Sequence, residues 1–229
     1  MVEATTSPAA GDSERKLRIA IIGASGAVGR EITEFAKNND QICELILLVR
    51  RALEEWQQED FTPKLTLLMK TDFESFDDVK EQLRGVDLFI CTLGSQAKYG
   101  REVFRRVDYE YPLRFAQLAK ELNVPHYSLL TSAGANANSC FNYLLVKGEV
   151  ERDVRALGLA HLTIYQPGLI KNRRNDDRCG EKCFGCLPCV TSIQAAHLGE
   201  SILLHAIEAV TTKDNRSDAS QNVVVLSNA

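Results

Sequence analysis

Short apolar runs alternate with amphipathic segments along most of the chain. Residues 17–23 (LRIAIIG) and 43–51 (CELILLVRR) are nearly continuous apolar runs, the pattern of parallel strands that are buried on both faces. Between these two runs, Val28, Ile32 and Phe35 recur at helical spacing. The first part of the chain is therefore predicted to form a strand, a helix and a second strand.

The same alternation continues toward the C-terminus. Further strands are predicted over 65–73, 86–94, 124–134, 160–168 and 222–228, and helices over 76–85, 101–123, 142–158 and 197–210, with Pro112 as the site of a kink or break. Strands that alternate with helices of this length indicate an α/β fold with a doubly wound, mostly parallel, Rossmann-like sheet. A single domain is expected over residues 17–229, after a disordered, polar N-terminal arm at 1–16.

Charge and composition exclude some classes of partner. The chain has 229 residues, a net charge of -4 and a pI near 5.7, which argues against nucleic acid as the main partner. Its apolar runs are too short to span a bilayer, and its first residues lack the apolar core of a secretory signal. A cytoplasmic location with reduced thiols is therefore expected.

A glycine-rich turn, GASGAVG, joins the first predicted strand to the first helix. Gly23, Gly26 and Gly29 would let a phosphate group approach the backbone N–H groups at the helix N-terminus, where the helix dipole favours an anion. The last glycine would also allow the helix to pack closely on the strand. The alternative is a purely structural turn. The turn residues predicted to bind a dinucleotide are Gly23, Ser25, Gly26, Ala27, Val28 and Gly29.

The second predicted strand ends in Arg50 and Arg51, where a carboxylate would hold the ribose 2′-hydroxyl of NAD. Two guanidinium groups can bind a 2′-phosphate instead, so the sequence predicts NADP(H) as the cofactor. The alternative is that both arginines are simply solvated. Topology alone places a further set of strand-end residues at the cofactor, namely Asp72, Phe73, Thr92, Leu93, Gly94, Pro167 and Gly168.

Three polar residues are candidates for catalysis. Tyr143 and Lys147 are four residues apart on a predicted helix and so share one face. A nearby ammonium group stabilises a phenolate, which would let the tyrosine exchange a proton near neutral pH, while the lysine could also hold the nicotinamide ribose. Ser132 follows the preceding strand and could hydrogen-bond a substrate carbonyl, with Thr131 as the neighbouring alternative. The other interpretation is an ordinary amphipathic helix.

Taken together, GASGAVG, VRR, the serine of LLTSAG, YLLVK and YQPG resemble the short-chain dehydrogenase/reductase superfamily, in particular its atypical, NADP(H)-binding branch. The resemblance implies a cofactor site at the glycine turn and the arginine pair, with Ser132, Tyr143 and Lys147 as a catalytic trio. It also implies protein partners, because members of this branch are reported to bind nuclear transport or transcription proteins, and hence a nuclear location as well. This sequence has Gln166 where the family pattern has arginine, which leaves the substrate open.

Four cysteines cluster near the C-terminal third of the chain, in a predicted loop at 171–189. Cys179, Cys183, Cys186 and Cys189 could hold zinc or an iron–sulfur cluster, or they could act as redox-active thiols. Zinc sites of four cysteines usually combine two separated pairs, so no metal site is predicted.

Two functions follow from these patterns. The first is an NADP(H)-dependent oxidoreductase that acts on a carbonyl or alcohol substrate, with Tyr143 as acid and base. The second is a regulatory protein without enzymatic activity that senses NADP(H) and binds protein partners. The presence of both Tyr143 and Lys147 favours the enzyme, because a pure sensor does not need them. A third, weaker hypothesis is a protein that responds to metal or redox state through its cysteine loop.

Overall fold

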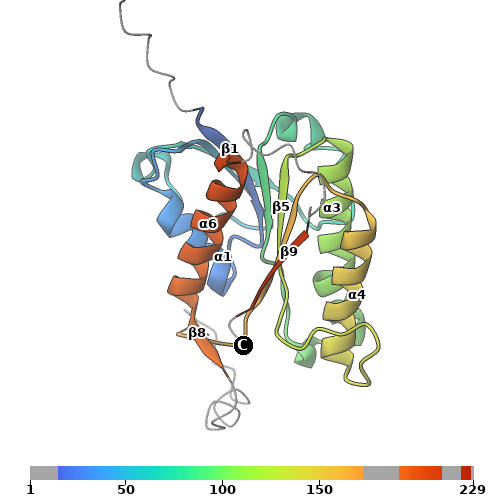
Figure 1. Cartoon of the computed structure of the whole chain (residues 1–229). Helices are drawn as coiled ribbons and strands as arrows, with labels where there is room; N and C mark the ends of the chain where they lie inside the picture. The colour runs from blue at the N-terminus through green and yellow to red at the C-terminus, as the bar shows by residue number, and fades with distance from the viewer. Residues whose placement is uncertain (1–14, 173–190, 213–222, 228–229) are drawn as a thin grey trace, which may run out of the picture.

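Parallel strands form the central layer of the molecule (Figure 1). The computed structural model describes residues 15–172, 191–212 and 223–227. Within them, a seven-stranded sheet has the order β3-β2-β1-β4-β5-β6-β9, and all its neighbouring strands are parallel. The strands are β1 (Leu17–Ile22), β2 (Ile42–Val49), β3 (Lys64–Met69), β4 (Leu88–Cys91), β5 (His126–Leu130), β6 (Leu162–Gln166) and β9 (Val223–Ser227).

Helices cover both faces of the sheet, and each face has its own apolar core. Helices α1 (Ala27–Ala36) and α6 (Ala195–Thr211) lie on one face, and α3 (Tyr111–Glu121) and α4 (Asn142–Ala156) lie on the other (Figure 1). Ile32 and Ile202 belong to the first core, whereas Phe89 and Phe115 stack at 4.3 Å between ring centroids in the second. A parallel sheet with helices packed on both of its faces confirms the predicted doubly wound α/β fold.

The strand order reverses between β1 and β4. From β1 the sheet grows outward to β2 and β3, and the chain then crosses over to place β4 on the other side of β1. In sheets of this kind, ligands bind outside the carboxyl ends of the strands at such a reversal. The turn that follows β1 and the segment that follows β4 therefore meet where a ligand is expected.

Several predicted elements differ from the structure in length or kind. The helix predicted over 76–85 is only a short 3-10 turn, η2 (Lys80–Leu83). The helix predicted over 101–123 is divided into α2 (Arg101–Arg105), a π-helical segment η4 (Arg106–Glu110) and α3. Pro112 lies in the first turn of α3, which continues directly from the π-helical segment. Its ring removes the hydrogen bond to the carbonyl four residues earlier, in the π-helical segment, so the helix is irregular just before the proline, where a kink or break is expected.

Smaller elements complete the described chain. Two 3-10 turns, η1 (Gln58–Asp60) and η3 (Ala97–Tyr99), lie in connections, and β7 (Leu169–Lys171) pairs with β8 (Ser192–Gln194) in a separate two-stranded sheet. The sequence does not predict this small sheet, because three residues are too few to show a period. None of the described helices has the length and apolar character needed to cross a membrane.

Candidate functional site

The glycine turn lies directly against the end of β4. Gly23 has a φ of +89°, and a Cβ at this position would lie 2.7 Å from the Thr92 carbonyl carbon and 2.8 Å from the Leu93 backbone nitrogen. The Thr92 N–H donates to the carbonyl oxygen of Ile22 at 3.0 Å. Only glycine permits both this backbone conformation and this close approach. The turn after β1 and the predicted cofactor residues after β4 are thus in contact.

Gly29 lets helix α1 pack onto the turn that precedes it. A Cβ at Gly29 would lie 2.2 Å from the carbonyl oxygen of Gly23, a distance that no side chain can adopt. Gly26 forms the N-cap of α1 without a side-chain cap, and the first turn of this helix has no acidic residue. Its N-terminal N–H groups therefore have no side-chain cap, which suits an anionic ligand such as a pyrophosphate.

The other predicted residues of the turn differ in exposure. Ser25 and Gly26 are exposed and Ala27 is half-buried, whereas the side chain of Val28 lies in the core. Val28 could therefore meet a cofactor only through its backbone. Because the exposed Gly26 puts no side chain over the uncapped N-terminus of α1, the residues fit a dinucleotide.

Arg30 is a residue of this turn that the sequence interpretation missed. Its Nε donates to the carbonyl oxygen of Ser25 at 3.1 Å, and its guanidinium lies 2.6 Å from Glu55. The arginine thereby ties the first turn of α1 back to the glycine-rich loop. The sequence offered one indication of this role, because Arg30 comes directly after Gly29 and its side chain must therefore lie beside the turn.

Arg50 and Arg51 follow the end of β2 at Val49. Both are exposed, and neither forms an ion pair with another residue of the described ranges. Two guanidinium groups without a protein counter-charge leave their hydrogen-bonding capacity for an anion in solution. Their role at a cofactor stays a prediction.

Asp72 and Phe73 follow β3, beyond Arg50 and Arg51 in the sheet. The Phe73 ring is buried and packs against Phe76 and Tyr111, at centroid distances of 6.1 and 5.7 Å. Asp72 is half-buried, and its carboxylate accepts a hydrogen bond from the Glu74 backbone N–H at 2.9 Å. A contact of Phe73 with a cofactor would therefore involve its backbone, whereas the side chain of Asp72 is partly open to solvent.

Tyr143 and Lys147 share one face of α4, as predicted. The Tyr143 ring is 39% exposed and contacts Phe104 at 5.6 Å between centroids, whereas Lys147 is buried. The Lys147 Nζ lies 4.0 Å from the position that a Cβ at Gly94 would take. The fold thus brings the lysine of α4 to the residues that follow β4, next to the glycine turn.

Lys147 has a buried partner that the sequence did not predict. Its Nζ lies 2.8 Å from the Asp108 carboxylate, and the side chains are 6% and 1% exposed, respectively. Burial disfavours the charged lysine, but attraction from Asp108 and Tyr143 outweighs this effect and raises the pKa of Lys147 above its usual value. The lysine is therefore held as an ammonium group.

Ser132 and Thr131 follow β5, and their hydroxyl groups have different partners. The Thr131 Oγ1 donates to the buried Glu151 carboxylate at 2.6 Å. The Ser132 Oγ donates only to the neighbouring carbonyl of Ala133, at 3.1 Å. Ser132 is also tied to the end of β6, because the Ala133 N–H donates to the Pro167 carbonyl at 2.8 Å. Of the two hydroxyl groups, that of Ser132 is more easily turned to a substrate.

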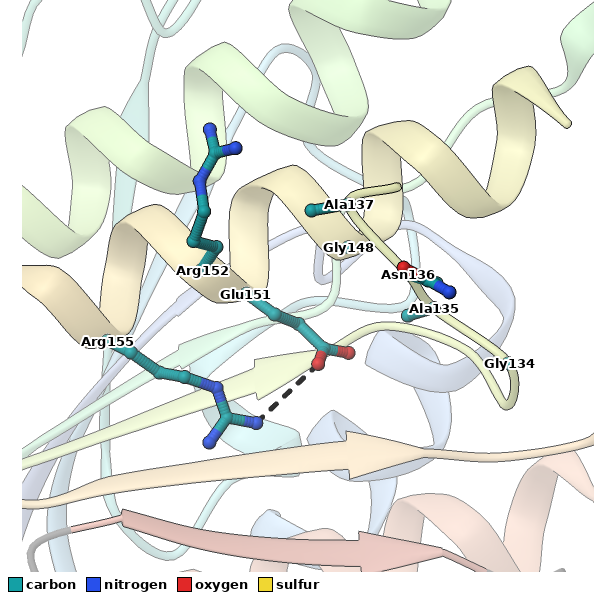
Figure 2. A pocket seen from close by; sticks show the side chains of 8 residues that line it. All are labelled: Gly134, Ala135, Asn136, Ala137, Gly148, Glu151, Arg152 and Arg155. Carbon is teal, nitrogen blue, oxygen red and sulfur yellow. Dashed lines mark ion pairs between the residues drawn. The ribbon is translucent and has the colours of Figure 1, made fainter. Parts of the chain in front are cut away.

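Gln166, which stands where the family pattern has arginine, contacts the Glu151 carboxylate that also accepts the hydrogen bond from Thr131. Gln166 Nε2 lies 2.9 and 2.8 Å from the two Glu151 oxygens, and Arg155 lies 3.6 Å away on the other side. Figure 2 shows Glu151 and Arg155 facing each other in a pocket of about 540 Å³. The pocket is bounded by α4 and by the loop that follows Ser132, at Gly134, Ala135, Asn136, Ala137, Gly148, Glu151, Arg152 and Arg155.

Gly168 marks the start of the small second sheet. A Cβ at Gly168 would lie 2.3 Å from the carbonyl oxygen of Thr191, so this residue packs directly on the segment that leads into β8. Cys179, Cys183, Cys186 and Cys189, and the rest of the predicted cysteine loop beyond residue 172, lie outside the described residues. Within the described ranges, no group of three His, Cys, Asp or Glu residues is placed to hold a metal ion.

Comparison with known proteins identifies the family. A model of a family described as NAD(P)H-binding matches residues 23–182, from the glycine turn to beyond β7. The chain belongs to this family. The protein named HTATIP2 from Rattus norvegicus is 36% identical over 173 residues, which cover 73% of this chain and 70% of the rat protein. The fold agrees too, since MoeE5, solved with UDP-glucose and NAD, superposes with a TM-score of 0.68 at 13% identity, over 92% of this chain and 75% of MoeE5.

The comparison contradicts the expected location. Protein FMP52 from Candida albicans is 33% identical over 162 residues, 68% of each chain, and is named a mitochondrial protein, as are five further fungal relatives. The cytoplasmic location predicted from the sequence, with the nucleus added by resemblance, is therefore not supported. The prediction was wrong because the sequence features on which it rested do not specify a compartment.

Proposed function

We propose that this protein is an NADP(H)-dependent oxidoreductase of the short-chain dehydrogenase/reductase type that interconverts a carbonyl and an alcohol. The observation that carries the proposal is the position of Lys147 beside Gly94, with Tyr143 one turn earlier on the same face of α4. This supports the proposal, because an ammonium group lies beside Gly94, which follows β4, and a phenol lies one helical turn away from that ammonium group on α4.

In the proposed site, different residues bind three parts of the dinucleotide, namely the pyrophosphate, the 2′-phosphate and the nicotinamide ribose. The N–H groups in the first turn of α1 would bind the pyrophosphate, and Arg50 and Arg51 would bind the 2′-phosphate. Lys147 would hold the nicotinamide ribose next to Gly94. When bound, NADPH supplies the hydride that is transferred to the carbonyl carbon of the substrate.

The side chains supply and orient the proton. Tyr143 donates its phenolic proton to the carbonyl oxygen of the substrate as that oxygen gains negative charge. Lys147 stabilises the phenolate that remains, because it is held as an ammonium group and acts on Tyr143 through space. The Ser132 hydroxyl donates a hydrogen bond to the same substrate oxygen and so fixes its position.

The proposal is tested by incubating the purified protein with NADPH and a wide panel of aldehydes and ketones. We expect NADPH absorbance to fall with at least one carbonyl compound, with the alcohol formed in equal amount. A protein that binds NADPH tightly but reduces none of the panel would contradict the proposal and would favour the sensing role without catalysis.

The arginine pair should determine the preference for the phosphorylated cofactor. Replacing both residues, in Arg50→Ser/Arg51→Ser, should weaken NADPH binding by about tenfold to a hundredfold, because hydrogen bonds to a charged group contribute about 1.5–3 kcal/mol. NADH binding should change little, since NADH lacks the 2′-phosphate. Both affinities can be measured by isothermal titration calorimetry.

A matched control separates this effect from the loss of two positive charges. Arg84→Ser/Arg152→Ser removes the same charge from exposed arginines that pair with Glu81 and Asp153 on the surface. This control should bind NADPH like the unaltered protein. An equal loss of NADPH affinity in both double variants would show that Arg50 and Arg51 make no specific contact.

A further inference from the structure

Asp108 is the most deeply buried carboxylate near the proposed site, and its two oxygens have different partners. One oxygen lies 2.8 Å from the Lys147 Nζ. The other accepts hydrogen bonds from the Ser95 backbone N–H at 2.8 Å and the Ser95 hydroxyl at 2.7 Å. A single carboxylate therefore joins a residue of α4 to the segment that follows β4.

The backbone that carries Asp108 has an unusual form. Residues Arg106–Glu110 are π-helical, in the middle of an otherwise α-helical stretch from α2 to α3. A π turn accommodates an extra residue and rotates the side chains that follow, and such turns are frequent at functional sites. The turn places Asp108 among buried groups, in a chain region whose neighbouring positions are exposed or half-exposed.

Two further contacts hold this segment against α4. The Tyr109 hydroxyl donates to the Asp153 carboxylate at 2.8 Å, and Arg105 pairs with Glu149 at 2.5 Å. Both partners belong to α4, on the exposed side of the same helix that carries Lys147. The position of Asp108 relative to α4 is thus set by contacts on either side of it.

The ion pair lies immediately behind Gly94. A Cβ at Gly94 would be 3.5 Å from the Asp108 carboxylate and 4.0 Å from the Lys147 Nζ, so the pair lies on the side of Gly94 from which a side chain would project. Gly94 itself is exposed. A ligand that lies against Gly94 would therefore meet Lys147 where Asp108 holds it.

We propose that Asp108 is a positioning residue, which fixes Lys147 beside Gly94, balances its charge in the buried site and links it through Ser95 to the end of β4. The inference concerns Lys147 in the cofactor-free protein, and only its consequence for catalysis rests on the proposed function. The nearby Cys91 thiol cannot replace the carboxylate, because burial raises its pKa to about 11 and the thiol therefore carries no charge at neutral pH.

The test follows the charge of Lys147 directly. Protein labelled with ¹³C at the lysine Cε is titrated by NMR from about pH 6 to about pH 10 without cofactor, with the Lys147 signal assigned from its absence in Lys147→Met. In the unaltered protein Lys147 should stay protonated throughout this range. In Asp108→Asn it should lose its proton within the range, because burial then acts on the ammonium without a counter-charge.

Asp153→Asn serves as the matched control, since it removes the same charge from a carboxylate that contacts α4 residues and Tyr109 but not Lys147. Its Lys147 signal should overlay that of the unaltered protein. A Lys147 signal that stays protonated over the whole range in folded Asp108→Asn would overturn the proposal. Failure of NADPH to bind would instead affect only the proposed function, because the titration uses no cofactor.

A second measurement applies if Asp108→Asn does not fold, since an uncompensated buried charge is strongly destabilising. Asp108→Asn/Lys147→Met removes both charges, so circular dichroism and urea unfolding should show that the double variant folds where Asp108→Asn alone does not. If the double variant failed to fold as Asp108→Asn does, the loss would not come from an uncompensated charge on Lys147 and the proposal would be wrong.

Discussion

Replacing Tyr143 by phenylalanine should lower the rate of NADPH-dependent carbonyl reduction by roughly 10²–10⁴-fold, the usual contribution of a positioned acid or base. The phenylalanine ring keeps the contact with Phe104, so the variant removes little more than the hydroxyl group. Because Tyr143 is largely solvent-facing at the surface of α4, folding should be unaffected. The measurement is a single-turnover rate with saturating NADPH and the best carbonyl substrate.

The control for this variant is Tyr99→Phe, which removes the hydroxyl of an exposed tyrosine. Tyr99→Phe should retain full turnover, and both variants should bind NADPH within about twofold of the unaltered protein. If Tyr143→Phe kept its turnover, Tyr143 would not be the proton donor. If it lost turnover only because NADPH no longer bound, the tyrosine would have a binding role instead.

Gly29→Ala should lower the free energy of unfolding by about 3 kcal/mol, at the upper end of the usual effect of overpacking. The added methyl group would lie 2.2 Å from the Gly23 carbonyl oxygen and 2.7 Å from the Ala24 Cα. Both are backbone atoms of the turn, which cannot move aside as a flexible side chain can. Helix α1 must then shift from β1, so NADPH binding should be lost as well. Urea unfolding and calorimetry measure the two effects.

Gly94→Ala is the matched control for stability. Its methyl group would meet the Asp108 carboxylate at 3.5 Å, an ordinary contact, so the free energy of unfolding should change by no more than about 0.5 kcal/mol. Equal stability of Gly29→Ala and the unaltered protein would show that the close packing of α1 on the turn is not required.

The strands and the glycine turn could be predicted from the sequence because each has a local signal. Buried parallel strands such as β1 and β2 are continuous apolar runs, and the turn that follows β1 combines glycine spacing with a position between a strand and a helix. The shared helix face of Tyr143 and Lys147 was predictable for a similar reason, since a spacing of four places two residues on one side of a helix.

Asp108 could not be predicted as the partner of Lys147, because the contact depends on how two helices pack. In a regular helix from 101 to 123 it would share a face with the buried Phe104, Tyr111 and Phe115, so its burial has a helical pattern, whereas its approach to Lys147 on α4 has no local signal. Glu151 was not predicted for a related reason. In the sequence it lies in a charged stretch of the helix, and only tertiary packing joins it to Thr131 and Gln166.

The short elements were also beyond the reach of the sequence pattern. The helix predicted over 76–85 is only the η2 turn, because Phe76 and Val79 are used as buried anchors of a loop rather than as one face of a helix. The cofactor choice between NADPH and NADH stands apart from these cases. It depends on two exposed arginines whose interactions are made with the ligand and not within the fold.

The central claim, that the glycine turn and the arginine pair form an NADP(H) site, is tested most directly by titrating the purified protein with NADPH and NADH in parallel while following its thermal unfolding. A ligand that binds only the folded state raises the midpoint, and a tighter ligand does so at a lower concentration. NADPH should raise the midpoint at lower concentrations than NADH. No shift with either cofactor would contradict the proposed site, and a stronger shift with NADH would contradict the role of Arg50 and Arg51.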